Sequence, residues 1–271
     1  MDLTKVKLVV FDMDGTLLNP AGQVSQRFFT LFKKLQKQQL LFCAASGRQY
    51  NSIVDKLAPI KDTIYIIAEN GGVAKKGNEV LLLKAIAASK VQEILPVLRN
   101  IKDTHIVLCT QETAFIESKD AAFIKLFQEY YHNYSIVDDL TTVAETTPIL
   151  KIATYHFSSS EIFIYPALQH LESDYLLKIS GQNWLDISSH GVHKGNALKE
   201  IQRLLNISKA ETMVFGDYLN DLEMFEEATF SFAMQNAHKT LKKRANYSTK
   251  SNSEFGMEEV LEKLLQANIK T

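Results

Sequence analysis

The chain contains 271 residues, of which 30 are lysine or arginine and 31 are aspartate or glutamate, so its formal net charge is −1. This balance removes the electrostatic argument for a nucleic-acid partner or an anionic membrane surface. Hydrophobic residues make up 46% and charged residues 23% of the chain, which excludes a disordered or fibrous protein and, at this length, predicts one or two globular domains.

Four apolar runs along the chain are too short for helices and predict strands that are buried on both faces. They are residues 6–11, 40–45, 64–68 and 213–215. Residues 25–38 carry apolar side chains at helical spacing, with Ser25 placed to cap the helix, and the same periodicity returns in 197–205 and 257–265. Strands that alternate with helices predict an α/β domain with a largely parallel sheet.

The middle of the chain follows a different pattern. Short alternating stretches favour antiparallel strands at residues 105–109, 114–117 and 150–157, and helical patterns interrupt them at 121–131 and 160–171. We therefore expect residues 84–182 to form a separate α+β unit. This unit would be inserted into an α/β domain made of residues 1–83 and 183–271.

The two cysteines, Cys43 and Cys109, lie far apart in apolar runs, which predicts buried free thiols and a reducing compartment. No apolar stretch approaches the roughly 18 residues that span a bilayer, and residues 1–7 lack the pattern of a signal peptide. We expect a cytoplasmic protein.

Each of the four predicted strands ends in a polar residue or a turn. In open α/β sheets, ligands bind beyond the carboxyl ends of the strands, so we expect these polar groups to meet at one edge. They are Asp12, Ser46, the pair Glu69 and Asn70, and the pair Gly216 and Asp217.

The first of these strand ends carries two carboxylates, Asp12 and Asp14, followed at once by Gly15. The glycine predicts a tight loop that can direct the two carboxylates differently, so that one can attack while the other transfers protons. An aspartate is already an anion at neutral pH and needs no base to activate it. The alternative is a simple turn in which the side chains bond to their own backbone.

Three further segments have both a functional and a structural interpretation. Ser46, Gly47 and Arg48 can hold an anion, or Ser46 can cap the next helix. Lys194 stands where a helix begins, a position at which its charge opposes the helix dipole. It can be a ligand-binding group, or it can be a solvated surface lysine. Asn220 and Asp221, like Asp217, can serve a site, or they can cap the helix that follows.

The expected site contains an excess of negative charge. Asp12, Asp14, Asp217 and Asp221 would place four negative charges beside the single positive charge of Lys194. Such a site needs a cation, and carboxylate ligands without cysteine or histidine favour Mg²⁺.

Four motifs in this order resemble those of the haloacid dehalogenase-like superfamily, and more narrowly the Cof-type hydrolases. They are Asp-x-Asp-Gly-Thr-Leu (12–17), Ser-Gly-Arg (46–48), Lys-Gly (194–195) and Gly-Asp-x-x-Asn-Asp (216–221). The resemblance implies a Rossmann-like, doubly wound core with a large α+β cap inserted between the second and third motifs. The chain departs from the family at Gln235, where glycine is usual, and at His193, where a small residue is commoner.

The resemblance also implies a role for each motif. Asp12 would attack phosphorus and form an aspartyl phosphate, while Asp14 would protonate the leaving oxygen and then activate water. Asp12, the backbone carbonyl of Asp14 and Asp217 would hold Mg²⁺, with Asp221 in support. The phosphoryl oxygens would be bound by Ser46, the Gly47 amide, Lys194 and Asn220.

Together these observations predict a Mg²⁺-dependent phosphatase of small phosphorylated metabolites, such as sugar phosphates or phosphorylated cofactors. A phosphotransferase or phosphomutase of the same fold is the nearest alternative, and a non-catalytic regulatory binding module is another. We expect neither a nucleic acid nor a membrane as partner. The sequence is compatible with a monomer and leaves open the substrate and the roles of Arg48, Asp221, His193 and Gln235.

Overall fold

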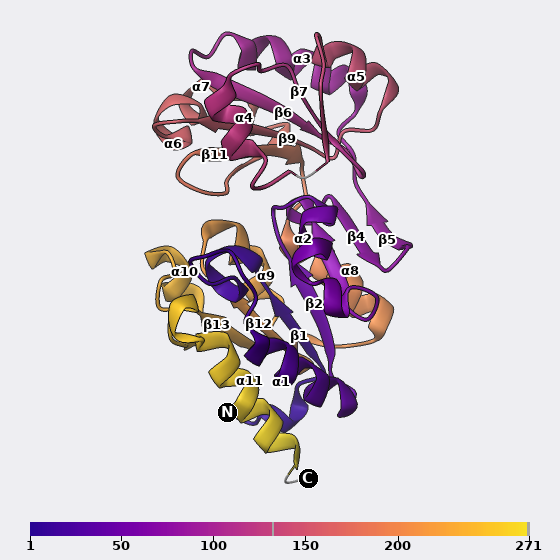
Figure 1. Ribbon diagram of the computed structural model, residues 1–271, viewed down its shortest axis with the longest axis vertical. Helices are drawn as coiled ribbons and strands as arrows, with labels where there is room; N and C mark the ends of the chain where they lie inside the picture. The colour runs from indigo at the N-terminus through magenta and orange to yellow at the C-terminus, as the bar shows by residue number, and fades with distance from the viewer. Residues whose placement is uncertain (132, 270–271) are drawn as a thin grey trace.

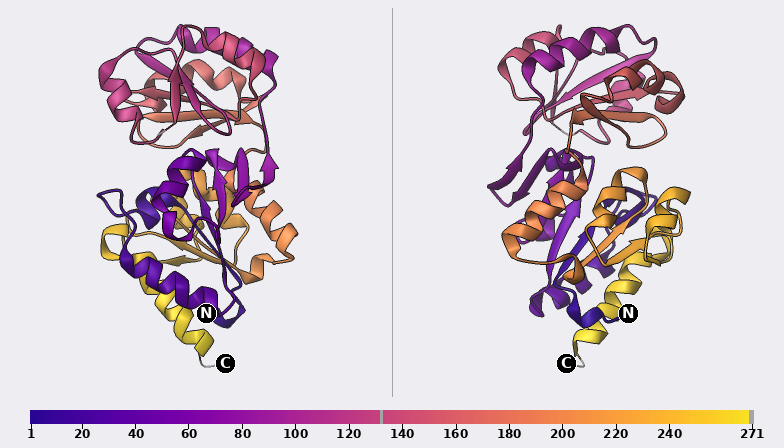
Figure 2. Two further views of the ribbon diagram at one scale, coloured as in Figure 1. Left: turned by 45° about the vertical axis from the view of Figure 1, so that its right-hand side comes forward. Right: turned by 180° about the vertical axis from the view of Figure 1, so that it is seen from behind.

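The strands of the protein form two separate sheets, which lie one above the other in Figure 1. The structure is a computed structural model that describes residues 1–131 and 133–269. The chain leaves the lower sheet after residue 83, builds the upper sheet with its helices, and returns to the lower part before residue 194. The N-terminus and the end of α11 (Gly256–Ile269) lie at the end of the molecule that is remote from the upper sheet (Figure 2).

The lower sheet has eight strands, and its central strands are parallel, as the alternation of strands and helices predicted. In spatial order the strands are β14 (Tyr247–Ser248), β13 (Phe230–Ala233), β12 (Thr212–Gly216), β1 (Leu8–Phe11), β2 (Leu41–Ala45), β3 (Tyr65–Ala68), β4 (Val73–Lys76) and β5 (Glu79–Leu83). The sequence order runs outward in opposite directions from β1 and β12. This reversal is the topological switch point at which open α/β sheets bind their ligands.

Six helices surround this sheet and cover its apolar residues. They are α1 (Gln26–Lys37), α2 (Tyr50–Lys56), α8 (Lys194–Leu205), α9 (Leu222–Glu226), α10 (Lys239–Arg244) and α11 (Gly256–Ile269). Ser25 caps α1 as predicted, because its hydroxyl accepts a hydrogen bond from the Phe28 amide at 3.0 Å. Helix α1 packs against α11, and α8 packs against α9.

The upper sheet has six mostly antiparallel strands, which agrees with the alternating pattern in the middle of the sequence. Its order is β10 (Tyr175–Ile179), β11 (Trp184–Ser189), β9 (Lys151–His156), β6 (Thr104–Cys109), β7 (Ala114–Ile116) and β8 (Tyr134–Ile136). The helices around it are α3 (Ala88–Arg99), α4 (Ala121–Phe127), α5 (Leu140–Thr146), α6 (Ser160–Phe163) and α7 (Tyr165–Leu168).

The structure differs from the expected boundary of the inserted unit. The expected boundary at residue 182 falls inside a hairpin, because β11 pairs with both β10 and β9 in the upper sheet. Residues 183–189 therefore belong with the upper sheet and not with the lower one. The expected helix over 160–171 is also wrong in detail, because it is divided into α6, α7 and a final 3-10 turn, with Pro166 in the first turn of α7.

Both cysteines are free and buried, as predicted. Within the described residues, none of the helices is long and apolar enough to cross a membrane.

Candidate active site

Three carboxylates from two distant segments meet at the switch point of the lower sheet. Asp12 directly follows β1, and its amide donates a hydrogen bond to the carbonyl of Phe215 in β12 at 3.0 Å. Asp217 directly follows β12. One carboxylate oxygen from each of Asp12, Asp217 and Asp221 lies within 4.8 Å of the others. The expected convergence of Asp12 with Asp217 is thus present in the structure.

Lys194 holds two of these carboxylates from within the protein. It begins α8, its side chain is fully buried, and its ammonium group donates to Asp12 Oδ1 at 2.6 Å and to Asp221 Oδ1 at 2.7 Å. The alternative of a solvated surface lysine is therefore wrong. His193 caps α8 by accepting a hydrogen bond at Nδ1 from the Asn196 amide. The buried ion pairs explain why a lysine stands against the helix dipole.

The cluster is under electrostatic stress without a further cation. Burial raises the pKa of Asp12 to about 7, with Lys194 acting in the opposite direction. Burial also raises the pKa of Asp217 to about 9, and the neighbouring Asp12 and Asp221 add to this effect. Both shifts have the sign expected when like charges are crowded in a region of low dielectric constant. A hard divalent cation between Asp12 and Asp217 would remove this stress.

A tight turn keeps the segment after β1 close to Asp217. Gly15 has a φ of +77°, and a Cβ atom at this position would collide with the Asp217 carboxylate. The neighbouring Thr16 hydroxyl donates to Asp217 Oδ1 at 3.3 Å. A residue without a side chain is therefore required for both the backbone conformation and the close approach.

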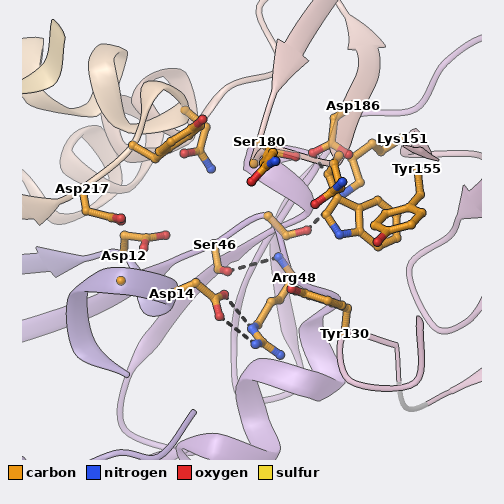
Figure 3. A pocket seen from close by; sticks show the side chains of 18 of the residues that line it. Asp12, Asp14, Ser46, Arg48, Tyr130, Lys151, Tyr155, Ser180, Asp186 and Asp217 are labelled. Carbon is orange, nitrogen blue, oxygen red and sulfur yellow. Dashed lines mark hydrogen bonds and ion pairs between the residues drawn. The ribbon is translucent and has the colours of Figure 1, made fainter. Parts of the chain in front are cut away.

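Asp14 points away from the carboxylate cluster toward Arg48, as Figure 3 shows. The guanidinium group donates to both carboxylate oxygens of Asp14 at 2.7 Å. Arg48 also donates to the carbonyl of Glu129 at 3.0 Å and lies 5.2 Å from the ring centre of Tyr130. Glu129 and Tyr130 follow α4 near the upper sheet. Arg48, whose role the sequence left open, thus joins Asp14 to the inserted unit.

The other sequence-predicted residues line the same space or support it. Ser46 does not cap α2, because Gln49 occupies the cap position and the Ser46 hydroxyl instead accepts from the Arg48 amide at 3.1 Å. The Asn220 side-chain amide donates to Asn70 Oδ1 at 3.0 Å.

Asp221 stands at the cap position of α9, but its side chain makes no capping hydrogen bond to that helix, so the structural alternative is wrong for Asp221. Its Oδ2 accepts hydrogen bonds from the amides of Asp217 and Tyr218 at 2.9 and 3.2 Å, which fixes the turn after β12. Protein groups therefore occupy both carboxylate oxygens of Asp221, whereas among the described residues the Asp217 carboxylate accepts one side-chain hydrogen bond, the long one from Thr16.

A second buried charge cluster, which the sequence did not indicate, connects the two sheets. Lys151 of β9 is 2% exposed, and its ammonium group contacts Glu69 at 2.8 Å, the Gly47 carbonyl at 2.8 Å and Asp186 at 3.4 Å. Asp186 of β11 also accepts from the Asn70 amide. Burial raises the pKa of both acids, and Lys151 opposes this rise. A charged lysine within an apolar strand is the signal that could have revealed the cluster.

A cavity of about 380 Å³ separates the acidic cluster from the inserted unit. Asp12, Asp14, Ser46, Gly47, Asp217 and Asn220 line it from the lower sheet. The side of the inserted unit contributes aromatic and polar residues to the lining. They are Leu126, Tyr130, Tyr131, Tyr155, residues 180–184 and Asp186. Most of the sequence-predicted site residues therefore line this cavity, whereas Lys194 lies outside the lining and contacts Asp12 from within the protein.

Comparison with known proteins agrees with this fold. A sequence model of the haloacid dehalogenase-like hydrolases matches residues 9–261. The chain is 31% identical over 268 residues to the 5-amino-6-(5-phospho-D-ribitylamino)uracil phosphatase YbjI of Escherichia coli, covering 96% of this chain and 97% of that protein. It is 26% identical to the phosphatase YwpJ of Bacillus subtilis, covering 96% of this chain and all of that one.

Solved structures show the same architecture. The crystal structure of SMU.1108c from Streptococcus mutans superposes with a TM-score of 0.88 at 26% identity, covering 96% of this chain and 99% of that one. The sugar phosphatase BT4131 of subclass IIB shares the fold with a TM-score of 0.82 at 21% identity, covering 95% and 98% of the two chains.

A doubly wound sheet that gathers carboxylates at its switch point defines an α/β enzyme. The chain belongs to the haloacid dehalogenase-like hydrolases, as the Cof-type motifs indicated.

Proposed function

We propose that this hydrolase is a Mg²⁺-dependent phosphatase that cleaves phosphate monoesters of small metabolites through an aspartyl phosphate on Asp12. One observation carries the proposal: the Asp12 carboxylate lies at the cavity beside Asp217, with one oxygen fixed by Lys194. The names of the relatives YbjI and YwpJ support the reaction class.

The residues of the acidic cluster fit a magnesium ion. Asp12 and Asp217 offer carboxylate oxygens at the cavity, and their pKa values are raised first by burial and then by the neighbouring carboxylates, which Lys194 offsets only in part. Asp12, Asp217 and the backbone carbonyl of Asp14 would hold the ion, with Asp221 supporting the site from behind. The ion would neutralise the developing charge on the phosphoryl oxygens.

Lys194 prepares Asp12 for attack on phosphorus. Its ammonium group fixes Asp12 Oδ1, so the carboxylate can form a bond to phosphorus while the bond to the leaving oxygen breaks. The Ser46 hydroxyl, the Gly47 amide and the Asn220 amide would bind the phosphoryl oxygens. Lys194, beside Asp12, would bind them as well. Most of the rate enhancement then comes from positioning and charge stabilisation.

Asp14 is the group that would transfer protons. It donates a proton to the leaving oxygen and later accepts one from the water molecule that attacks the phosphorus of phospho-Asp12. Its carboxylate side chain is 48% exposed, and each of the two oxygens that accept from Arg48 keeps a second lone pair for the substrate oxygen. Arg48 thus orients Asp14 and stays paired with it.

The inserted unit would act as a cap over this chemistry. We propose that residues 84–189 close the cavity, exclude water and contact the leaving group. The hydrogen bond from Arg48 to the Glu129 carbonyl and the ion pair of Lys151 with Glu69 support this arrangement. We further propose a cytoplasmic enzyme acting on a small phosphorylated molecule.

A panel of phosphate monoesters, assayed with Mg²⁺ in ¹⁸O-labelled water, tests the proposal. We expect release of free phosphate that contains the label, and a loss of turnover by orders of magnitude in Asp12→Asn, which keeps the side-chain volume. Transfer of phosphate to an added alcohol without incorporation of label would identify a phosphotransferase. If no ester in the panel is hydrolysed, the protein is a binding module instead.

A further inference from the structure

The cavity has an aromatic wall opposite the acidic cluster, formed by Tyr130, Tyr155 and Trp184. The Trp184 ring meets the Tyr130 ring at 5.5 Å and 65°, and the Tyr155 ring at 4.9 Å and 61°. Tyr130 and Trp184 are only half-buried, so part of their ring surface is available to a ligand. Figure 3 places Tyr130 and Tyr155 on the side of the cavity away from Asp12 and Asp217.

This wall is part of a packed aromatic cluster and is therefore preformed. Tyr131 stacks on Phe127 of α4 at 4.6 Å and 14°, and Tyr155 lies 5.7 Å from Phe123. Phe123 and Phe127 are completely buried in the core beside the upper sheet. Since the wall is anchored in this core, a ligand that packs on it pays little for ordering side chains.

Positive charge at this end of the cavity is already neutralised. Arg48 is paired with Asp14, and Lys151 is buried with Glu69 and Asp186. A leaving group that carried a second phosphate or a carboxylate would find no unpaired cation among the described residues that line this wall. The wall therefore favours an uncharged leaving group.

The hairpin loop between β10 and β11 adds hydrogen-bonding groups at the edge of the wall. The Asn183 side-chain amide is already engaged, because it donates to the carbonyls of His156 and Phe157 at the end of β9 at 2.8 and 2.9 Å. The exposed Gln182 side chain also lines the cavity, and no partner for its amide is present in the described part of the chain. An amide can both donate to and accept from the polar edge of a heterocycle.

We propose that the leaving group is an uncharged alcohol that carries a planar heteroaromatic ring, which packs on Tyr130 and Trp184 while Gln182 pairs with the edge of the ring. The proposal rests on the proposed phosphatase function and specifies its substrate class. The cavity volume of about 380 Å³ exceeds what a phosphoryl group needs and lies in the range of small-molecule sites.

Two matched pairs of esters test this specificity with the full-length enzyme and Mg²⁺. Ribose 5-phosphate is compared with uridine 5′-monophosphate, and ribitol 5-phosphate with riboflavin 5′-phosphate, so that each pair differs mainly by the ring. For at least one pair, we expect kcat/KM of the ring-bearing ester to be about tenfold higher or more, as base stacking on aromatic side chains predicts.

Variants then locate the source of the preference. Trp184→Leu and Tyr130→Leu are each expected to reduce the preference to about unity, and Gln182→Ala to reduce it partly. Phe163→Leu is the matched control, because Phe163 is an exposed aromatic residue of α6 that stacks on His156 outside the wall. Melting temperatures show which variants remain folded. One folded wall variant, either Trp184→Leu or Tyr130→Leu, is enough to test whether the preference comes from the wall.

Equal kcat/KM values within both pairs would overturn the proposal, as would wall variants that lower both members of a pair by the same factor. These outcomes leave the phosphatase function intact, because the ringless esters are still hydrolysed. Failure of the phosphatase function gives a different result, namely no hydrolysis of any of the four esters and no difference between the wild type and Asp12→Asn.

Discussion

Replacing Asp217 with asparagine separates the stability of the acidic cluster from its function. The substitution keeps the size of the side chain and removes one carboxylate from the group formed with Asp12 and Asp221. In the metal-free protein, burial and these two neighbours raise the pKa of Asp217 from 3.8 to about 9. Asp217 is therefore protonated in the folded protein at neutral pH and ionised in the unfolded chain.

The sign and size of the effect follow from this difference. The folded state binds the extra proton, so the free energy of unfolding falls as the pH rises from about 4 to about 9. At pH 7 the shift corresponds to a destabilisation of about 4 kcal/mol at most. Asparagine avoids the charge but must still be desolvated, so we expect a gain of about 1–3 kcal/mol. This corresponds to a rise in Tm of roughly 2–10 °C.

Thermal denaturation between pH 5 and pH 9, with EDTA or with Mg²⁺, measures both effects. In EDTA, we expect the wild type to lose stability as the pH rises and Asp217→Asn to be more stable and less dependent on pH. Saturating Mg²⁺ should reverse the order, because a ligand at 1,000 times its Kd stabilises by about 4.1 kcal/mol. The variant should gain little from Mg²⁺ and lose hydrolysis. Asp138→Asn, whose side chain is 99% exposed, is the matched control and should resemble the wild type.

Two results would refute this reasoning. One is that Asp217→Asn is less stable than the wild type in EDTA at pH 8. The other is that Mg²⁺ stabilises the variant and the wild type equally, since Asp217 would then contribute nothing to the metal site.

Three further predictions address other parts of the structure. Gly15→Ala should abolish hydrolysis because its Cβ collides with the Asp217 carboxylate, whereas Gly77→Ala, with a φ of +55° and nothing near its Cβ, should retain activity in the same assay. Lys151→Met leaves two buried carboxylates without their cation and should lower the free energy of unfolding by about 3–5 kcal/mol in urea denaturation. Lys102→Met is the control, because the Lys102 side chain is 91% exposed, and equally small losses of stability in both variants would contradict this explanation. The thiols should resist alkylation in the native protein, because burial raises the pKa of Cys43 and Cys109; rapid labelling without denaturant would contradict this.

The lower sheet could be predicted from the sequence because its central strands are uniformly apolar. Strands β1, β2, β3 and β12 are almost completely buried, so their sequences show no alternation and end abruptly at a polar residue. The parallel arrangement then forces Asp12 and Asp217 to the same edge, although 205 residues separate them in the sequence. The edge strands β5 and β14 are half-exposed or exposed along their length and gave no such signal.

The contacts between the two sheets could not be predicted in the same way. Arg48 reaches the Glu129 carbonyl and Lys151 reaches Glu69 across sequence distances that no local pattern records. The misplaced boundary at residue 182 has a similar cause. Strand β11 continues a hairpin from β10, and its pairing with β9, from Trp184 opposite Tyr155 to Ile187 opposite Ile152, assigns it to the upper sheet.

The account depends most on the covalent use of Asp12, which can be measured by trapping the intermediate. Asp14→Asn slows the attack of water, and with p-nitrophenyl phosphate, whose leaving group needs no proton, it should let the phosphorylated protein accumulate after mixing with Mg²⁺ and quenching with acid. Peptide mass spectrometry should then find one phosphoryl group on Asp12, which hydroxylamine removes. Release of phosphate with Asp12 unmodified at every quench time, or a phosphoryl group on another residue, would contradict the account.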